Sequence, residues 1–183
     1  MTKDFRFIGR LCLDFAQTGD MGWGERYERL TKPTELQRWL SMSSLQLAAI
    51  RVTEKDLAEA KTVRGAIWRV AQAILSRTDP AVADIRLINR SGCQPNLVKE
   101  LDGKATKAGW HRPNFTAAMA TIAADAVSLF GDPGQRARLR RCEHPRCRTI
   151  FYDDSRPGLR RWCASNRCGD RVRASAYRER NRS

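Results

Sequence analysis

The sequence predicts an α+β protein that is mainly α, with a helical N-terminal domain containing a few short strands, followed by a small module made of a β-hairpin and a helix. Two observations predict this class. Apolar residues recur at helical spacing through the N-terminal part of the 183-residue chain. That pattern stops near the C-terminus, where four cysteines follow in two equally spaced pairs. A hydrophobic content of 42% allows an ordinary core in the first part.

The first segment, residues 5–16, predicts a short strand interrupted at Gly9, because apolar residues alternate with polar or small ones. The start of a helix fits the same residues equally well. A glycine-rich loop follows at 19–24 and matches no phosphate-binding fingerprint. If the N-terminal domain senses a small molecule, we expect Asp14 and Trp23 to lie at its pocket.

Three helices are predicted from capping residues that precede apolar periodicity. Thr34 is expected to cap the first helix. Thr53 begins the longest helix, with Asp56 three residues later as in a capping box. Asp79-Pro80 opens the third, since proline is tolerated in a first turn. The expected buried face of the longest helix consists of Leu57, Ala60, Val63, Ile67, Ala71, Ile74 and Leu75.

A small hairpin is predicted over residues 96–110, because Asp102-Gly103 suits a two-residue turn. Asn114 then caps a further helix whose many alanines favour close helix packing. This helix is expected to end before the segment 131–134, Gly-Asp-Pro-Gly.

The segment 131–134 is the predicted domain boundary. We assign residues 1–134 to a helical domain for sensing or dimerisation, and residues 135–183 to the C-terminal module. The charge supports this division: the net charge is +14, and the stretch from Gln135 onward carries 15 Arg, no Lys and 5 acidic residues, a net of +10. Such a field attracts polyanions, and the arginine fork suits phosphate and guanine edges.

The four cysteines predict a metal site. Cys142 and Cys147 enclose four residues, as do Cys163 and Cys168, and fifteen residues separate the pairs. Four thiolates from two short turns suit one tetrahedral structural zinc, whose binding would supply the folding energy of the module. His144 could replace a cysteine as ligand, although four thiolates already complete the shell. Two disulfides and an iron–sulfur cluster remain alternatives.

The compartment also favours metal over disulfides. The N-terminus lacks the apolar region of a signal peptide, and no run of about 18 apolar residues could span a membrane. We therefore expect a cytoplasmic protein that does not enter membranes, in which paired cysteines bind metal. Cys12 and Cys93 lie outside the pattern and are expected to be buried thiols.

The module has a treble-clef-like order. Residues 137–142 are expected to form a strand into the first cysteine turn, and 149–153 its hairpin partner. A helix should then run from Cys168 to about Arg180. Backbone amides in such turns typically donate to the thiolates. Phe151 and Trp162 are expected in the core of the module rather than as base-stacking platforms.

These residues resemble two known families. The pattern from Cys142 to Arg171 resembles the CGNR zinc finger, and Leu11–Thr18 resembles the opening of the ABATE domain that precedes it. The resemblance implies a bacterial, stress-related transcription regulator whose zinc finger binds DNA. The chain departs from the family pattern at Asp170 and at Gln17, where the families have asparagine. The change at Asp170 adds a negative charge beside any phosphate.

Arginines around the second cysteine pair are the predicted nucleic-acid contacts. Those on the C-terminal helix share a face or neighbouring faces with Arg182. DNA is the expected partner, and RNA, an acidic protein, a second copy of the chain and a small-molecule effector of unknown identity stay open. The predicted contacts are Arg160, Arg161, Arg171, Arg173 and Arg178.

Nothing in the sequence favours catalysis. The two histidines, His111 and His144, belong to no Ser-His-Asp or HExxH pattern. Four thiolates would leave zinc no open position for an activated water. We therefore expect a binding protein rather than an enzyme. The alternative to a DNA-binding regulator is a small-molecule sensor or interaction module whose zinc finger docks a protein or RNA.

Overall fold

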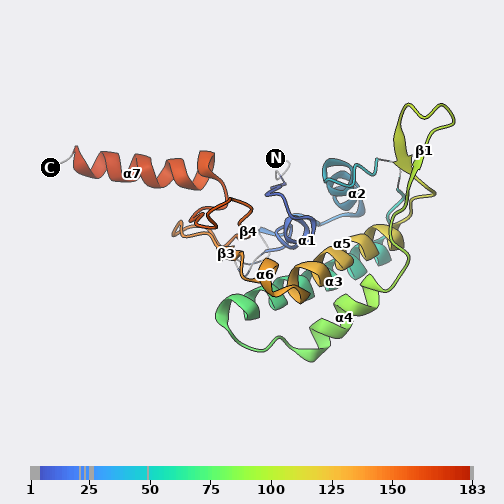
Figure 1. The fold of residues 1–183 in the computed structure, drawn as a ribbon, viewed down its shortest axis with the longest axis horizontal. Helices are drawn as coiled ribbons and strands as arrows, with labels where there is room; N and C mark the ends of the chain where they lie inside the picture. The colour runs from blue at the N-terminus through green and yellow to red at the C-terminus, as the bar shows by residue number, and fades with distance from the viewer. Residues whose placement is uncertain (1–4, 21, 23, 25–26, 49, 182–183) are drawn as a thin grey trace.

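The computed structural model of the chain describes residues 5–20, 22, 24, 27–48 and 50–181. Figure 1 shows an elongated molecule in which a C-terminal helix projects from a helical body, with a small hairpin near the other end. The predicted class, mainly α with a few short strands, is confirmed. Trp23 and Arg182 lie outside the described residues. No helix within the described residues is long and apolar enough to cross a membrane.

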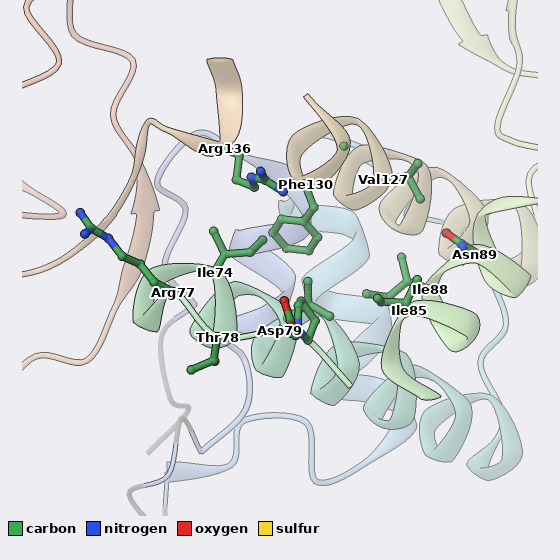
Figure 2. A pocket seen from close by; sticks show the side chains of 13 residues that line it. Ile74, Arg77, Thr78, Asp79, Ile85, Ile88, Asn89, Val127, Phe130 and Arg136 are labelled. Atoms are coloured by element: carbon green, nitrogen blue, oxygen red, sulfur yellow. The ribbon is translucent and has the colours of Figure 1, made fainter. Parts of the chain in front are cut away.

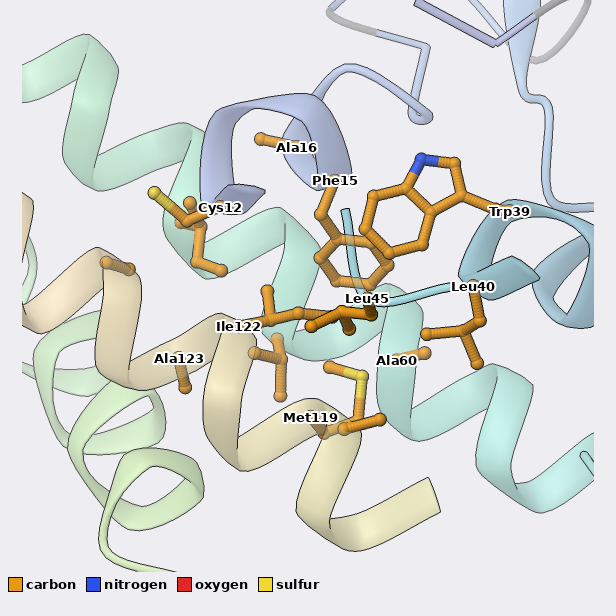
Figure 3. Packing of buried hydrophobic residues seen from close by; sticks show 14 of the residues in the cluster. Cys12, Phe15, Ala16, Trp39, Leu40, Leu45, Ala60, Met119, Ile122 and Ala123 are labelled. Atoms are coloured by element: carbon orange, nitrogen blue, oxygen red, sulfur yellow. The ribbon is translucent and has the colours of Figure 1, made fainter. Parts of the chain in front are cut away.

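The helical body is built around two long helices, α3 and α5, with α1 and α4 packed against both of them. Figure 3 shows the interior where these helices meet α2, with Phe15 and Trp39 in contact at a ring-centroid distance of 5.0 Å. The five helices are α1 (Leu11–Ala16), α2 (Pro33–Met42), α3 (Glu54–Ser76), α4 (Val82–Gly92) and α5 (Phe115–Gly131).

Two predicted caps are confirmed. The Thr53 hydroxyl accepts a hydrogen bond from the Asp56 backbone N–H at 3.2 Å, and the Asp56 carboxylate accepts one from the Thr53 N–H at 2.8 Å. Asn114 Oδ1 accepts from the Ala117 N–H at 2.9 Å at the start of α5. Each cap satisfies backbone donors that the first helical turn would otherwise leave free.

The strand predicted in residues 5–16 is wrong, and its helical alternative is correct. Residues 12–16 of α1 are all buried, so a helix covered on nearly every side has no polar face to reveal its period. Asp14 holds the entering chain by accepting a hydrogen bond from the Ile8 N–H at 2.6 Å. Gly9, with φ 99°, takes the left-handed backbone needed at that turn.

Two predicted helix starts are also wrong. Thr34 does not cap α2, because Pro33 is already its first residue and the Glu35 carboxylate accepts from the Lys32 N–H at 3.2 Å. Helix α4 begins at Val82 rather than at Asp79-Pro80. Residues 78–81 instead form the connection between the end of α3 and the start of α4.

The predicted hairpin forms from β1 (Lys99–Leu101) and β2 (Ala108–Trp110), paired antiparallel. Its connection is not the expected two-residue turn. The Asp102 carboxylate accepts hydrogen bonds from the Thr106 N–H and hydroxyl, both at 2.7 Å, so the loop runs over residues 102–107. The aspartate side chain therefore closes a wider loop than the Asp-Gly pattern suggests.

A short helix, α6 (Pro133–Arg136), connects α5 to the C-terminal module. There β3 (Leu139–Arg141) pairs antiparallel with β4 (Ile150–Tyr152), and a π-helical turn at Ser165–Gly169 leads into α7 (Asp170–Arg180). The predicted hairpin and C-terminal helix are thus both present.

The β3–β4 hairpin contributes to two cores. Leu139 and Ile150 are buried in the main core of the helical body, whereas Phe151 is buried among the cysteines. Because neighbouring residues of a strand point to opposite faces, one strand can serve both cores. The hydrophobic core therefore continues across the boundary that the sequence suggests at residues 131–134.

Candidate metal centre and nucleic-acid interface

The four predicted ligand cysteines come together. The sulfur atoms of Cys142, Cys147, Cys163 and Cys168 all lie within 4.8 Å of one another. Cys163 Sγ is 3.9 Å from Cys147 Sγ and 3.8 Å from Cys168 Sγ. A regular tetrahedron with Zn–S bonds of about 2.3 Å has edges of about 3.8 Å. The four free thiols therefore fit one zinc ion, and no sulfur is bridged to another.

Local hydrogen bonds fix the cysteine turns. The Cys147 N–H donates to the His144 carbonyl at 2.8 Å, closing the first turn, and the Cys168 N–H donates to the Ala164 carbonyl at 3.1 Å in the second. The Glu143 N–H donates to the Arg161 carbonyl at 2.9 Å, which joins the two turns.

His144 is outside the metal cluster found among the described residues. Its Nδ1 instead accepts a hydrogen bond from the Arg146 N–H at 3.1 Å within the first turn. The four-thiolate set is therefore complete without it, as the spacing of the cysteines predicts.

The cysteines perturb one another strongly. Hydrogen bonds from Cys142 and Cys163 hold the pKa of Cys147 far below its usual range. The same kind of contact with Cys142 and Cys147 raises the pKa of Cys163 far above it. Four thiolates this close would repel one another, and a zinc ion held by the four cysteines would offset that repulsion and release the protons that the sulfurs share. The module would therefore be more stable with its metal bound.

Asp153 organises the loop that follows the hairpin. Its Oδ1 accepts from the Ser155 N–H at 3.0 Å and hydroxyl at 2.6 Å, and its Oδ2 accepts from the Arg160 N–H at 2.8 Å. Burial opposes ionisation, but these hydrogen bonds hold the pKa of Asp153 below its usual range. The spacing of Asp153, Ser155 and Arg160 in the sequence pattern thus reflects a structural role.

Three of the five predicted nucleic-acid contacts are engaged in ion pairs, namely Arg160, Arg161 and Arg173. Arg160 also lies over the Phe151 ring at 5.2 Å, and Arg161 over the Trp162 ring at 5.1 Å. Phe151 is buried, as predicted for a core residue. The pairs are Arg160–Asp154 at 2.5 Å, Arg161–Glu143 at 2.6 Å and Arg173–Asp170 at 2.5 Å.

The other two predicted contacts, Arg171 and Arg178, are exposed on α7. Neither has an ion-pair partner within the part of the chain that the structure describes. Helix α7 has no buried residue, and in Figure 1 it projects clear of the helical body. Arg171 and Arg178 are therefore accessible to a large partner.

Two hollows beside the metal site gather further arginines. The smaller, of about 190 Å³, lies against Cys147, Cys163 and Cys168, and the larger, of about 620 Å³, lies between the first cysteine turn and α7. Arg146 and Arg171 line both of them. Arg6, Arg167 and Arg178 extend this lining at its two ends. The set Arg6, Arg146, Arg167, Arg171 and Arg178 is called the arginine groove below.

Three members of the arginine groove, Arg6, Arg146 and Arg167, are absent from the predicted contacts. Arg146 and Arg167 lie between the paired cysteines, which a bound metal would bring to one surface. Their positions in the sequence therefore indicate them as candidate contacts. Arg6 could not be found in this way, because it reaches the site only through the fold of the N-terminal segment.

The small-molecule pocket expected at Asp14 is not found among the described residues. Asp14 is 6% exposed, and burial raises its pKa to about 7 against the opposing hydrogen bond from the Ile8 N–H. Its carboxylate supports the entry to α1 rather than lining a hollow. Cys12 is buried as predicted, but Cys93 is exposed because it follows the last residue of α4, beyond the packed face.

The fold and the metal site define a helical domain that carries a four-cysteine zinc finger. Residues 9–133 match the ABATE family, described as "Putative stress-induced transcription regulator", and residues 138–181 match the CGNR zinc finger. The chain belongs to the ABATE family and ends in a CGNR zinc finger. Comparison with curated proteins gives no match.

Proposed function

We propose that the chain is a DNA-binding transcription regulator that contacts duplex DNA through the arginine groove and helix α7. The observation that carries this proposal is the arginine groove itself. Five guanidinium groups from the N-terminal segment, both cysteine turns and α7 line two adjoining hollows. None of the five has an ion-pair partner among the described residues, so their charge is available for phosphate oxygens.

Helix α7 suits entry into the major groove. Its 11 residues span about 16 Å, and a helix of about 10–12 Å diameter fits a groove of about 12 Å width. Its main packing partner among the described elements is the π-helical turn that precedes it, so no neighbouring helix of the body blocks its approach. Arg171 and Arg178 would reach base edges or phosphates from it.

The zinc ion would hold the groove in shape. Cys142, Cys147, Cys163 and Cys168 would bind it, and it supplies a rigid cross-link between the two turns. Because a zinc with four thiolates carries a net negative charge, nearby guanidinium groups also stabilise the site itself. We propose that the protein acts by binding and not by catalysis, since four thiolates leave no position for substrate.

The test is binding of the zinc-loaded protein to random-sequence duplex DNA by fluorescence anisotropy at rising salt. Arg171→Ala and Arg178→Ala should each weaken binding and reduce the slope of log affinity against log salt by about one. Arg86→Ala, which removes the same charge from an exposed position on α4, serves as control and should leave the slope unchanged. Equal losses in all three variants would refute the groove as the binding surface.

Selection from a random duplex pool then separates specific from general binding. An enriched motif that survives near-physiological salt would support a regulator, and a palindromic motif would support a homodimer. Enrichment from single-stranded RNA instead of duplex DNA, or retention of an acidic protein with no nucleic-acid binding, would replace DNA with one of those partners.

A further inference from the structure

The helical body contains an apolar hollow of about 560 Å³ where α3, α4, α5 and α6 meet (Figure 2). It opens because α3 ends at Ser76 and Arg77 adopts the left-handed backbone, with φ 55°. The chain then turns away before α4 begins. The apolar lining consists of Val70, Ile74, Ile85, Ile88, Val127 and Phe130.

Two of these apolar residues remain unusually open. Ile85 is 39% exposed and Val127 is 43% exposed. Covering such side chains with an apolar group removes their surface from water and is favourable. The volume also lies within the range of small-molecule sites. The hollow is therefore suited to the apolar part of a small ligand.

Polar groups at the rim indicate the charge of that ligand. The lining includes Arg77, Arg136, Asp79 and Asn89, so arginines outnumber carboxylates. In Figure 2 the guanidinium group of Arg136 lies beside Phe130, whereas that of Arg77 points away from the apolar side chains. Arg136 has no ion-pair partner in the described part of the chain. A guanidinium group at the edge of an apolar hollow favours a carboxylate, which it can bind through two hydrogen bonds.

We propose that this hollow binds a small amphipathic carboxylate, with its apolar part among the isoleucine, valine and phenylalanine side chains and its carboxylate on Arg136. This site goes beyond the proposed DNA binding and does not depend on it. Asp79, on the other side of Phe130 in Figure 2, disfavours a second negative charge and so limits the ligand to a monoanion.

The hollow is connected directly to the zinc module. Arg136 belongs to α6, and β3 begins at Leu139, only a short step along the chain. Gln72 of α3 accepts a hydrogen bond from the Arg141 guanidinium at 2.5 Å. Gln72 lies on the same helix as the lining residues Val70 and Ile74 but on its other side, since residues two apart on a helix do not share a face. Strand β3 is thus attached to α6 and to α3, and both helices contribute lining residues, so a ligand that shifts either helix would alter the seating of the hairpin.

The probe is octanoate, added to the zinc-loaded full chain and measured by isothermal titration calorimetry without DNA. Octan-1-ol and octylamine provide the neutral and cationic counterparts of the same length. We expect octanoate to bind more tightly than both. Arg136→Gln should weaken octanoate binding at least tenfold and leave octan-1-ol unchanged, while Val127→Trp, which fills the hollow, should weaken both. Arg86→Gln is the matched control.

Absence of octanoate binding, tighter binding of octylamine, or a loss under twofold in Arg136→Gln would overturn the proposed ligand class. Because Arg136 and Val127 are exposed, their variants should fold, and thermal unfolding checks this. The link to the module is tested by amide NMR: octanoate should shift residues 139–141. Shifts confined to α3, α4 and α5 would refute that link. Since no nucleic acid is present, these outcomes are independent of DNA binding.

Discussion

Arg10 and Asp125 join the first helix to α5, with Nε and Oδ1 3.0 Å apart. The Asp125 carboxylate also accepts a hydrogen bond from the Cys12 N–H at 2.9 Å, and the Arg10 guanidinium lies over the Tyr152 ring at 5.7 Å. One ion pair therefore touches α1, α5 and β4. It connects the helical body to the strand that carries the zinc module.

Arg10→Ala should lower the free energy of unfolding by about 1–3 kcal/mol, because it leaves a mostly buried carboxylate without its cation. Urea unfolding of the zinc-loaded protein measures this change. Arg86→Ala, which removes an exposed arginine, is the control and should change stability by less than about 0.5 kcal/mol. Equal stability of the two variants would show that the Arg10–Asp125 pair contributes nothing net.

Removal of zinc should destabilise more than the module. Cys163→Ser removes one thiolate from the set, so we expect loss of bound zinc, measured by a colorimetric zinc assay after gel filtration. The main helices should remain visible by circular dichroism, but with a lower melting temperature, because Leu139 and Ile150 of the same hairpin belong to the main core. Cys93→Ser, an exposed cysteine outside the cluster, should retain one zinc per chain. Full zinc retention by Cys163→Ser would contradict the four-thiolate site.

Asp14 should make stability fall as the pH rises. Burial raises its pKa from 3.8 to about 7, so the folded state binds more protons than the unfolded state between those values. The contribution of Asp14 to the free energy of unfolding is therefore most favourable below the unfolded pKa and falls as the pH rises through about 7. The total loss is at most about 4 kcal/mol. Asp14→Asn keeps an acceptor for the Ile8 N–H but cannot ionise.

Urea unfolding at pH 5 and at pH 8 compares the two proteins. The Asp14→Asn variant should lose less stability across this interval than the natural sequence. Both proteins must stay zinc-loaded, which metal analysis of each sample verifies. An identical pH dependence would mean that Asp14 ionises normally.

Asp170→Asn should strengthen DNA binding. Asp170 pairs with Arg173 at 2.5 Å, and its loss removes a negative charge and frees that guanidinium group for phosphate. We expect the slope of log affinity against log salt to become steeper by about one. The double variant with Arg173→Ala should lose this gain, and a gain that persists in it would place the effect on the charge of Asp170 alone.

The sequence predicts the structure correctly where local hydrogen bonds or metal ligation determine it. The caps at Thr53 and Asn114 and the cysteine spacing are such cases. At α1 the expected strand is wrong and its helical alternative is correct, because burial of nearly the whole helix hides its periodicity. At Asp102 the two-residue turn is wrong, because the aspartate side chain closes a longer loop. The arginine groove could be predicted only in part, since Arg6 reaches it through tertiary packing that no spacing in the sequence indicates.

The shared hairpin affects how this zinc finger can be handled as a unit. A fragment cut at the family boundary, residues 138–181, would keep all four cysteines yet present Leu139 and Ile150 to water. Such a fragment would tend to self-associate even when fully metallated, and grafting it onto another protein would require polar replacements at these two positions. The zinc finger and the helical body therefore share part of one hydrophobic core, and the finger is not expected to fold or transfer as an independent unit.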